Sequence, residues 1–389
     1  MKPEPLRVIH APTTVGGNPQ GLSRALRRDG VESTALAVDQ NYFAYPTDVV
    51  LNRPGDSKWT RERRRLRAIF KILPQYDVVH YNFGTTIAQP HPAFIFGGAP
   101  GRRQKLSYWL RAKYQWLLQL LELSNLRRRG IPIFMTYQGD DARQGEYQRR
   151  HFPISIASQV EPTYYNPVGD AFKQASIKRM DRYCTRIYAL NPDLLRVLPG
   201  RAEFVPYSHV FMDEWLPCYT QAEDRPLRIA HAPSHRGVKG THLVLEALDR
   251  LKAKGREFEL VLVENLPNHE AKRRYETADV LIDQLFAGWY GGLAVEAMAL
   301  GKPVIVYIRQ EDLQYIDPAM AADLPFIEAS PDTIEVVLER VLAMPRTELL
   351  ALARKSRAFV EKWHDPQVVA ARIKADYEQA LGESKSLGR

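Results

Sequence analysis

A single carboxylate, Glu296, lies in an apolar stretch that follows the glycine pair Gly291 and Gly292. Residues 288–307 read GWYGGLAVEAMALGKPVIVY, so strong helix formers follow the glycines and a Val/Ile run follows a Gly-Lys-Pro sequence. This order predicts a loop, a helix and a strand, with Glu296 one turn into the helix. A carboxylate there can accept hydrogen bonds from both hydroxyls of a ribose. The structural alternative is a carboxylate stabilised by the helix dipole or paired with Lys302.

A basic loop follows the apolar run at 227–232 and reads HAPSHRGVKG. It places two cations and two glycines at one strand-to-helix turn. Fixed cations beside a helix N-terminus favour a polyanion such as a diphosphate. A solvated basic loop is the alternative. The ligand-binding candidates in this loop are Ser234, His235, Arg236, Lys239 and Gly240.

Two further loops in the first half of the chain follow apolar runs. Gly16 and Gly17 allow positive φ and a close approach of a ligand to the backbone, before a helix whose free amides favour an anion. Gly139 interrupts the sequence TYQGDDAR, where Asp140 and Asp141 either cap the next helix or bind a substrate hydroxyl or an arginine. We expect Gly139 and Asp140 on the acceptor side.

Nine apolar runs of strand length must position these loops. They are separated by segments of helix length, a pattern typical of parallel strands covered by helices on both faces. Both halves therefore read as doubly wound α/β domains, whose ligands bind beyond the carboxyl ends of the strands. The runs are residues 7–11, 34–38, 77–81, 131–137, 186–190, 227–232, 258–264, 279–285 and 303–308.

Composition limits the class of protein. The chain has 389 residues, a net charge of +9 and two cysteines, Cys184 and Cys218. Its length indicates at least two domains, and its few cysteines and lack of a long uncharged apolar run predict a cytoplasmic protein. The basic clusters suit nucleotide phosphates, nucleic acid or an anionic membrane. We expect domains at 1–220 and 226–365, a polar linker at 218–227, and a C-terminal helix at 366–389 that crosses back to the first domain.

Together these motifs resemble the retaining nucleotide-sugar glycosyltransferases of the GT-B fold, closest to the large bacterial family four. The residues that carry the resemblance are GWYGGLAVEAMALGKPVI and HAPSHRGVKG, within about 227–365. The resemblance implies two Rossmann-like domains facing across a cleft, with a nucleoside diphosphate sugar as co-substrate and no metal.

The resemblance also implies roles for individual residues. Glu296 matches the glutamate that holds the ribose hydroxyls. Lys239 and Arg236 match the cations on the donor pyrophosphate, and we expect both to be catalytic. Further donor contacts fall on Gly16, Gly17, Gly291, Gly292 and Leu293.

Two positions depart from the family pattern. The first of its two glutamates, which touches the donor sugar, falls on Gly288, and its histidine falls on Gln138. Asp283, Trp289 or Asp141 are candidates to replace the missing acid, and we assign Asp283 to donor binding and Asp141 to catalysis.

The predicted activity is transfer of a sugar to an acceptor hydroxyl, with retention implied by the resemblance alone. Residues 105–126 form a largely apolar helix flanked by basic clusters. This helix either belongs to the core of the first domain or lies on the inner face of an anionic membrane. The second case indicates a lipid-linked acceptor and cell-surface polysaccharide assembly. Alternatives are a sugar-nucleotide epimerase, an inactive sugar-nucleotide-binding protein, and a nucleic-acid binder, the last of which does not explain Glu296.

Overall fold

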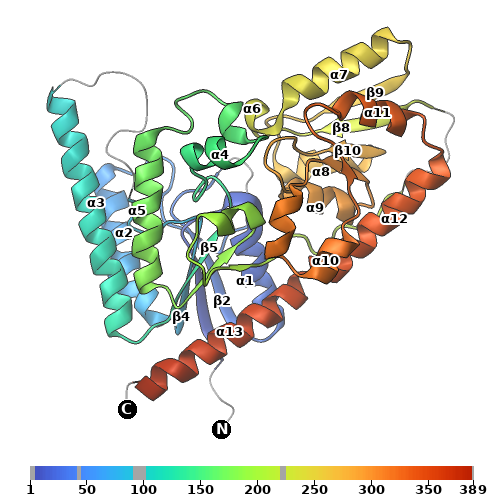
Figure 1. Cartoon of the computed structure of the whole chain (residues 1–389). Helices are drawn as coiled ribbons and strands as arrows, with labels where there is room; N and C mark the ends of the chain where they lie inside the picture. The colour runs from blue at the N-terminus through green and yellow to red at the C-terminus, as the bar shows by residue number, and fades with distance from the viewer. Residues whose placement is uncertain (1–4, 42–44, 91–101, 220–224, 388–389) are drawn as a thin grey trace.

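The computed structural model describes residues 5–41, 45–90, 102–219 and 225–387. The chain folds into two parallel sheets, each covered by helices on both faces (Figure 1). The predicted doubly wound α/β architecture is confirmed. Part of the predicted linker, residues 220–224, lies outside the described residues.

The first sheet has the strand order β3-β2-β1-β4-β5-β6-β7, and its strands pair in parallel. Its strands are β1 (Arg7–Ala11), β2 (Glu32–Ala37), β3 (Val49–Val50), β4 (Val78–Asn82), β5 (Ile133–Tyr137), β6 (Arg186–Ala189) and β7 (Glu203–Phe204). The α-helices of this part are α1 (Asn18–Arg28), α2 (Lys58–Arg67), α3 (Arg102–Arg128), α4 (Gly145–His151) and α5 (Pro167–Tyr183).

The second sheet has the order β12-β11-β10-β8-β9 and is also parallel. Its strands are β8 (Leu227–His231), β9 (Phe258–Leu262), β10 (Val280–Ile282), β11 (Val304–Val306) and β12 (Ile327–Glu328). The helices are α6 (Arg236–Lys239), α7 (Thr241–Ala253), α8 (Asn268–Glu276), α9 (Gly292–Ala299), α10 (Pro318–Asp323), α11 (Ile334–Leu342), α12 (Arg346–Trp363) and α13 (Pro366–Leu387). Short 3₁₀ or π turns lie at Val15–Gly17, Ala68–Ile72, Leu73–Gln75, Ile156–Ser158, Pro192–Arg196 and Gln310–Tyr315.

All nine predicted strands are present. Most are largely buried, as parallel strands covered on both faces require, whereas β9 at the edge of the second sheet is only partly buried. The three strands that the sequence did not reveal, β3, β7 and β12, have only two residues each, too few for an apolar run of strand length.

The C-terminal helix α13 packs on the first sheet although it follows the second domain in sequence (Figure 1). Its residues Ile373 and Tyr377 share a buried cluster with Val8, Phe134 and Tyr188. The helix therefore ties the two halves together, and the amphipathic pattern at 366–381 supplies the apolar face that this requires.

Candidate functional site

A cavity of about 280 Å³ lies where the glycine loop after β1 faces the second domain. Its walls come from the segments that follow β1, β2, β7, β8 and β9, from α8 and from the start of α9. Such a position, beyond the carboxyl ends of parallel strands, is where open α/β sheets bind ligands. The lining residues are Val15, Gly16, Tyr45, His209, Ala232, Pro233, Ser234, Lys239, Val263, Asn265, Leu266, Asn268, Ala271, Tyr275, Gly292, Leu293 and Glu296.

Glu296 contributes a largely buried carboxylate to this cavity. Its Oε1 accepts a hydrogen bond of 2.8 Å from Asn268 Nδ2, and His209 Nε2 lies 3.6 Å from the same oxygen. The alternative partner Lys302 is engaged elsewhere, since its ammonium donates to the Cys218 carbonyl at 2.5 Å. A carboxylate has about four acceptor positions, so Glu296 keeps capacity for ligand hydroxyls.

Lys239 lines the same cavity and is mostly buried. Its Nζ donates to Asp283 Oδ1 at 2.6 Å and to Gln284 Oε1 at 3.0 Å. An ammonium has three N–H donors, so these two contacts leave one for a ligand. The fully buried Asp283 neutralises the charge of Lys239, and the pair offers a directed donor more than a free positive charge.

The start of α9 forms the wall next to Lys239. The Gly291 amide donates to Asp283 Oδ2 at 2.7 Å, so it is occupied within the protein. Gly292 and Leu293, the first residues of the helix, line the cavity. The first amides of a helix lack intrahelical partners and favour an anion. A side chain at position 292 would meet the His209 ring at 3.1 Å, which explains the glycine there.

Tyr45 brings the first domain into the cavity. Its ring lies against Gly17, where a Cβ would approach the ring carbons to 2.6 Å. Its hydroxyl is 3.5 Å from Asn268 Nδ2, the amide that also contacts Glu296. Gly17 does not line the cavity itself but provides the space for Tyr45, whereas Gly16 does line it.

Part of the cavity lining is apolar. It includes Val263, Leu266, Ala271, Tyr275 and Leu293. Glu296 and Lys239 line the same cavity. An apolar surface, a carboxylate and an ammonium in one cavity match the base, the ribose and the phosphates of a nucleotide.

Three residues of the basic loop do not line the cavity. Arg236 is exposed and forms an ion pair with Glu264 at 2.7 Å, so the structure does not bring it to the cavity, and its contact with the donor phosphates stays a prediction. His235 caps α6 by accepting from the Val238 amide, and its ring lies 5.2 Å from that of Tyr164. Gly240, with φ of +76°, begins α7 next to Phe286. Of this loop, Ser234 and Lys239 reach the cavity.

The loop after β5 also lies outside this cavity. Asp141 accepts from the amides of Gln138 and Gly139, at 3.1 and 2.6 Å, so it closes its own turn. Burial raises the pKa of its carboxyl to about 6. Asp140 accepts from the hydroxyls of Tyr164 and Tyr165. The predicted catalytic role of Asp141 therefore has no geometric support, because its carboxylate serves the backbone.

Gly288 cannot hold the missing glutamate. Its φ is +75°, a region that disfavours side chains, and a Cβ would lie 2.5 Å from Arg309 Nη1. Arg309 is buried there, bonded to Asp312 at 2.9 Å and to the Ile154 carbonyl of the first domain at 2.9 Å. Trp289, another suggested replacement, is fully buried in the core of the second domain.

Gln138, at the position of the family's histidine, lies beside the glycine loop. Its Oε1 is 3.7 Å from the point where a Cβ on Gly16 would be. Its Nε2 is buried, and no residue of the described chain accepts from it. Gln138 does not line the cavity but lies next to Gly16, which does.

Sequence reasoning missed Tyr45, His209, Asn268 and Tyr275. Asn268 could have been found from the sequence, because it lies in the loop that follows the predicted strand at 258–264, and such loops bind ligands in this fold class. The other three carry no local pattern that distinguishes them from core or surface residues.

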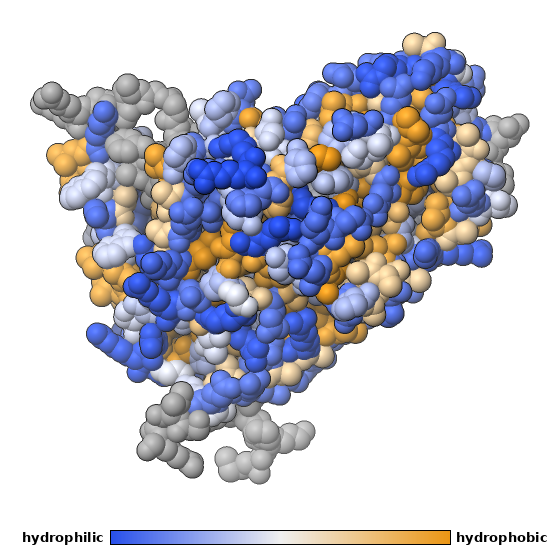
Figure 2. All heavy atoms as spheres, in the orientation of Figure 1, coloured by the Kyte–Doolittle hydropathy of each residue, from blue (hydrophilic) through white to orange (hydrophobic). Residues whose placement is uncertain are grey.

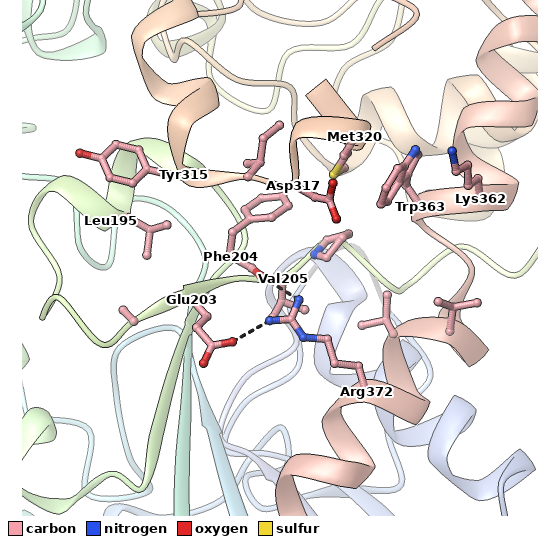
Figure 3. Close-up of a pocket in the computed structure, with 15 residues that line it drawn as sticks. Leu195, Glu203, Phe204, Val205, Tyr315, Asp317, Met320, Lys362, Trp363 and Arg372 are labelled. Atoms are coloured by element: carbon pink, nitrogen blue, oxygen red, sulfur yellow. Dashed lines mark hydrogen bonds and ion pairs between the residues drawn. The ribbon is translucent and has the colours of Figure 1, made fainter. Parts of the chain in front are cut away.

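A second cavity, of about 510 Å³, lies where β7, α10, α12 and α13 meet (Figure 3). Its charged groups are engaged within the protein. Arg372 pairs with Glu203 at 2.7 Å, and Lys362 pairs with Asp323 at 2.7 Å. The strand-end loops that carry the predicted site residues do not contribute to this cavity, so the smaller one is the candidate site.

No family model and no curated protein matches this chain. Solved structures do match it over nearly their whole length. Sucrose-phosphate synthase from Thermosynechococcus elongatus is 13% identical with a TM-score of 0.59. The match covers 97% of this chain and 100% of that one. The catalytic domain of starch synthase IV from Arabidopsis thaliana, bound to ADP and acarbose, is 13% identical with a TM-score of 0.58. The match covers 97% of this chain and 100% of that one. WaaG, a glycosyltransferase involved in lipopolysaccharide biosynthesis, is 13% identical with a TM-score of 0.50. The match covers 93% of this chain and 98% of that one. The chain has the GT-B fold that such glycosyltransferases share.

Proposed function

We propose that this protein is a glycosyltransferase that moves a sugar from a nucleoside diphosphate sugar to an acceptor hydroxyl. The observation that carries this proposal is that the smaller cavity brings together apolar side chains, the Glu296 carboxylate, the Lys239 ammonium and the first residues of α9. The similarity to GT-B structures supports it through the fold alone.

Each part of the donor has a place in this proposal. The base lies against Leu266 and Tyr275, and the ribose hydroxyls donate to Glu296. The diphosphate accepts from Lys239 and from the amides of Gly292 and Leu293. The sugar then extends toward the glycine loop, beside which Gln138 lies.

In the proposed reaction the bond between the sugar C1 and the phosphate oxygen breaks, and its electron pair stays on the departing diphosphate. The acceptor oxygen forms the new bond to C1. Lys239 and the helix amides stabilise the leaving charge without a metal. The family resemblance suggests that the diphosphate takes the acceptor proton and that configuration is retained.

The acceptor that we propose is a glycan or lipid-linked sugar of the bacterial cell surface. WaaG, which is described as acting in lipopolysaccharide biosynthesis, is similar in fold. This part of the proposal rests on fold similarity and on the surface described in the next subsection.

Two observations favour a second candidate, a protein that binds a sugar nucleotide without turnover. Asp283 neutralises Lys239, and Gly288 provides no acid beside the donor sugar. Such a site would bind the nucleotide while stabilising the leaving diphosphate less than a free cation would.

The test combines a nucleotide panel with Glu296 variants. The melting temperature is measured with ribonucleoside diphosphates and their 2′- and 3′-deoxy analogues, for wild type, Glu296→Ala and a surface control, Glu246→Ala. Ligand at about 100 times its Kd adds ~2.7 kcal/mol of stability. We expect wild type and the control to prefer the ribonucleotide, and Glu296→Ala to lose that preference.

If no nucleotide stabilises wild type, the donor-site proposal is wrong. If a nucleotide binds, its sugar conjugates are incubated with and without acceptor sugars. Product formation only with an acceptor supports transfer. An altered sugar nucleotide without an acceptor indicates an epimerase, and binding with no product of either kind supports the second candidate.

A further inference from the structure

The N-terminal half of α3 projects from the first domain. From Lys105 to Tyr114 every residue except Ala112 is exposed, including apolar ones, and Trp109 and Leu106 are 50% and 58% exposed. In Figure 1 this helix runs along the outer edge of the first domain, on the side away from the second domain. Figure 2 shows hydrophobic side chains along the same edge. Of the two alternatives for residues 105–126, a core helix therefore does not describe this half.

The C-terminal half of α3 anchors the helix. Leu118, Leu123 and Leu126 belong to the core. Glu122 is fully buried, and its carboxylate accepts from the Tyr81 hydroxyl and from the amide of Ala88, at 2.6 and 2.9 Å. The projecting half is thus held rigidly, and its exposure is part of the fold.

Helix α2 extends the exposed region. The Tyr114 hydroxyl donates to Glu62, so the two helices are in contact. Trp59, at the start of α2, is 75% exposed. We call the exposed residues of 58–67 and 105–121 the α2–α3 surface. Its large apolar members include Trp59, Leu106, Trp109, Leu110, Leu117 and Leu121.

The charge of this surface is strongly one-sided. Residues 58–67 and 105–121 contain a single acid, Glu62, which pairs with Arg65 at 2.5 Å. The exposed cations are Lys58, Arg61, Arg63, Arg67, Lys105, Arg111 and Lys113. Aromatic and leucine side chains among cations are typical of proteins that lie in the headgroup region of an anionic bilayer.

Two other occupants fit less well. A second copy of the chain would bring cations against cations. A nucleic acid would accept the cations and stack on the aromatic rings, but leucines such as Leu106, Leu110 and Leu117 would gain nothing from it. No described helix is long and apolar enough to cross a bilayer, so the contact would be peripheral.

We propose that the α2–α3 surface docks the protein on an anionic bilayer, with leucine and tryptophan side chains among the acyl chains and cations on lipid phosphates. The contact uses the first domain alone and leaves the second domain free to move over the donor. Docking does not depend on sugar transfer. If both hold, the acceptor is a lipid-linked sugar presented at the bilayer.

The experiment is flotation of the full chain, without nucleotide, with vesicles of phosphatidylcholine alone or mixed with phosphatidylglycerol. We expect binding to the anionic vesicles only, weakened by salt. An apolar variant, Leu106→Ser/Trp109→Ser/Leu110→Ser, should lose most of the bound fraction. A charge variant, Arg61→Gln/Arg111→Gln/Lys113→Gln, should bind more weakly by about fivefold per cation removed.

The matched control is Val336→Ser, an exposed apolar residue on α11 of the second domain, which should float like wild type. Circular dichroism and melting confirm that each variant is folded. Failure of wild type to float, or equal flotation of all variants, overturns the proposal. A wild-type dimer that the apolar variant abolishes assigns the surface to a second copy, and tight oligonucleotide binding lost in the charge variant assigns it to nucleic acid. Both also overturn the proposal.

Discussion

The Lys239 ammonium lies 2.6 Å from the carboxylate of Asp283, a side chain with no solvent exposure. Asp283 in turn accepts from the amide of Gly291, one residue before α9. A single buried acid therefore fixes both the cation and the glycine loop at the proposed phosphate position. This arrangement links the stability of the second domain to the geometry of the site.

Removing Lys239 should affect both properties. Lys239→Ala leaves Asp283 buried without its cation, which costs about 3 kcal/mol of unfolding free energy by analogy with broken buried pairs. Arg236→Ala removes a solvent-exposed partner of Glu264 and should leave stability and nucleotide affinity close to wild type. Urea unfolding and calorimetric titration with a nucleoside diphosphate check both variants. A larger loss of affinity in Arg236→Ala than in Lys239→Ala would reverse the assignment.

Restoring the family's acid should not restore its function here. Gly288→Glu places a side chain at φ of +75° and drives its Cβ into Arg309. The backbone conformation alone costs about 1–2 kcal/mol, and displacing the buried Arg309 adds to it. We expect a lower melting temperature for Gly288→Glu and a smaller decrease for Gly288→Ala. A Gly288→Glu protein as stable as wild type would show that the loop can rearrange.

Asn268 should act as a positioning residue for Glu296. Its amide donates to the carboxylate at 2.8 Å, so Asn268→Ala frees the side chain to rotate. One net hydrogen bond is worth ~1 kcal/mol, so ribonucleotide affinity should fall about fivefold. The preference for ribose over deoxyribose should fall with it, while Asn268→Asp, which repels Glu296, should be worse. His269→Ala, on an exposed neighbour, is the control for titration calorimetry.

Acid should destabilise the first domain through its buried histidines. Burial lowers the pKa of His10 to about 3, and no described residue bonds its ring nitrogens. The ring centre of His80 lies 5.1 Å from that of His10, and burial together with His10 lowers the pKa of His80. The unfolded chain binds protons from about pH 6.5 downward, whereas the folded chain does not. Stability is thus fully present above that pH and is lost as pH falls toward the folded pKa values.

The matching variant is His10→Leu, which removes one of these protons. Each such histidine contributes up to about 1.4 kcal/mol of unfolding free energy per pH unit. Urea unfolding between about pH 7 and pH 5 should therefore give a shallower slope for His10→Leu. His151→Gln changes an exposed histidine and should keep the wild-type slope. Equal slopes for all three proteins would contradict a neutral, buried His10.

The amino-acid sequence determined the elements and their order. Runs such as 133–137 and 227–231 carry too many apolar side chains to remain exposed, and the helical periods between them require parallel pairing. The end of α9, at Ala299 and just before Gly301 and Pro303, followed from backbone chemistry alone. The position of Glu296 at the cavity could be predicted for the same reason, because a glycine pair, a helix start and a strand end are all local features.

The tertiary structure decided which side chains meet. Asp283 and Lys239 are far apart in the sequence, and their pairing depends on how β10 lies beside β8. Tyr45 and Asn268 come from different domains, and Arg309 fills the space beside Gly288 through a fold of the chain that no short window encodes. Likewise, the composition of α3 could not show where the core ends along it. Propensity and periodicity act over a few residues, whereas pairing, burial and exposure depend on the packing of the whole chain.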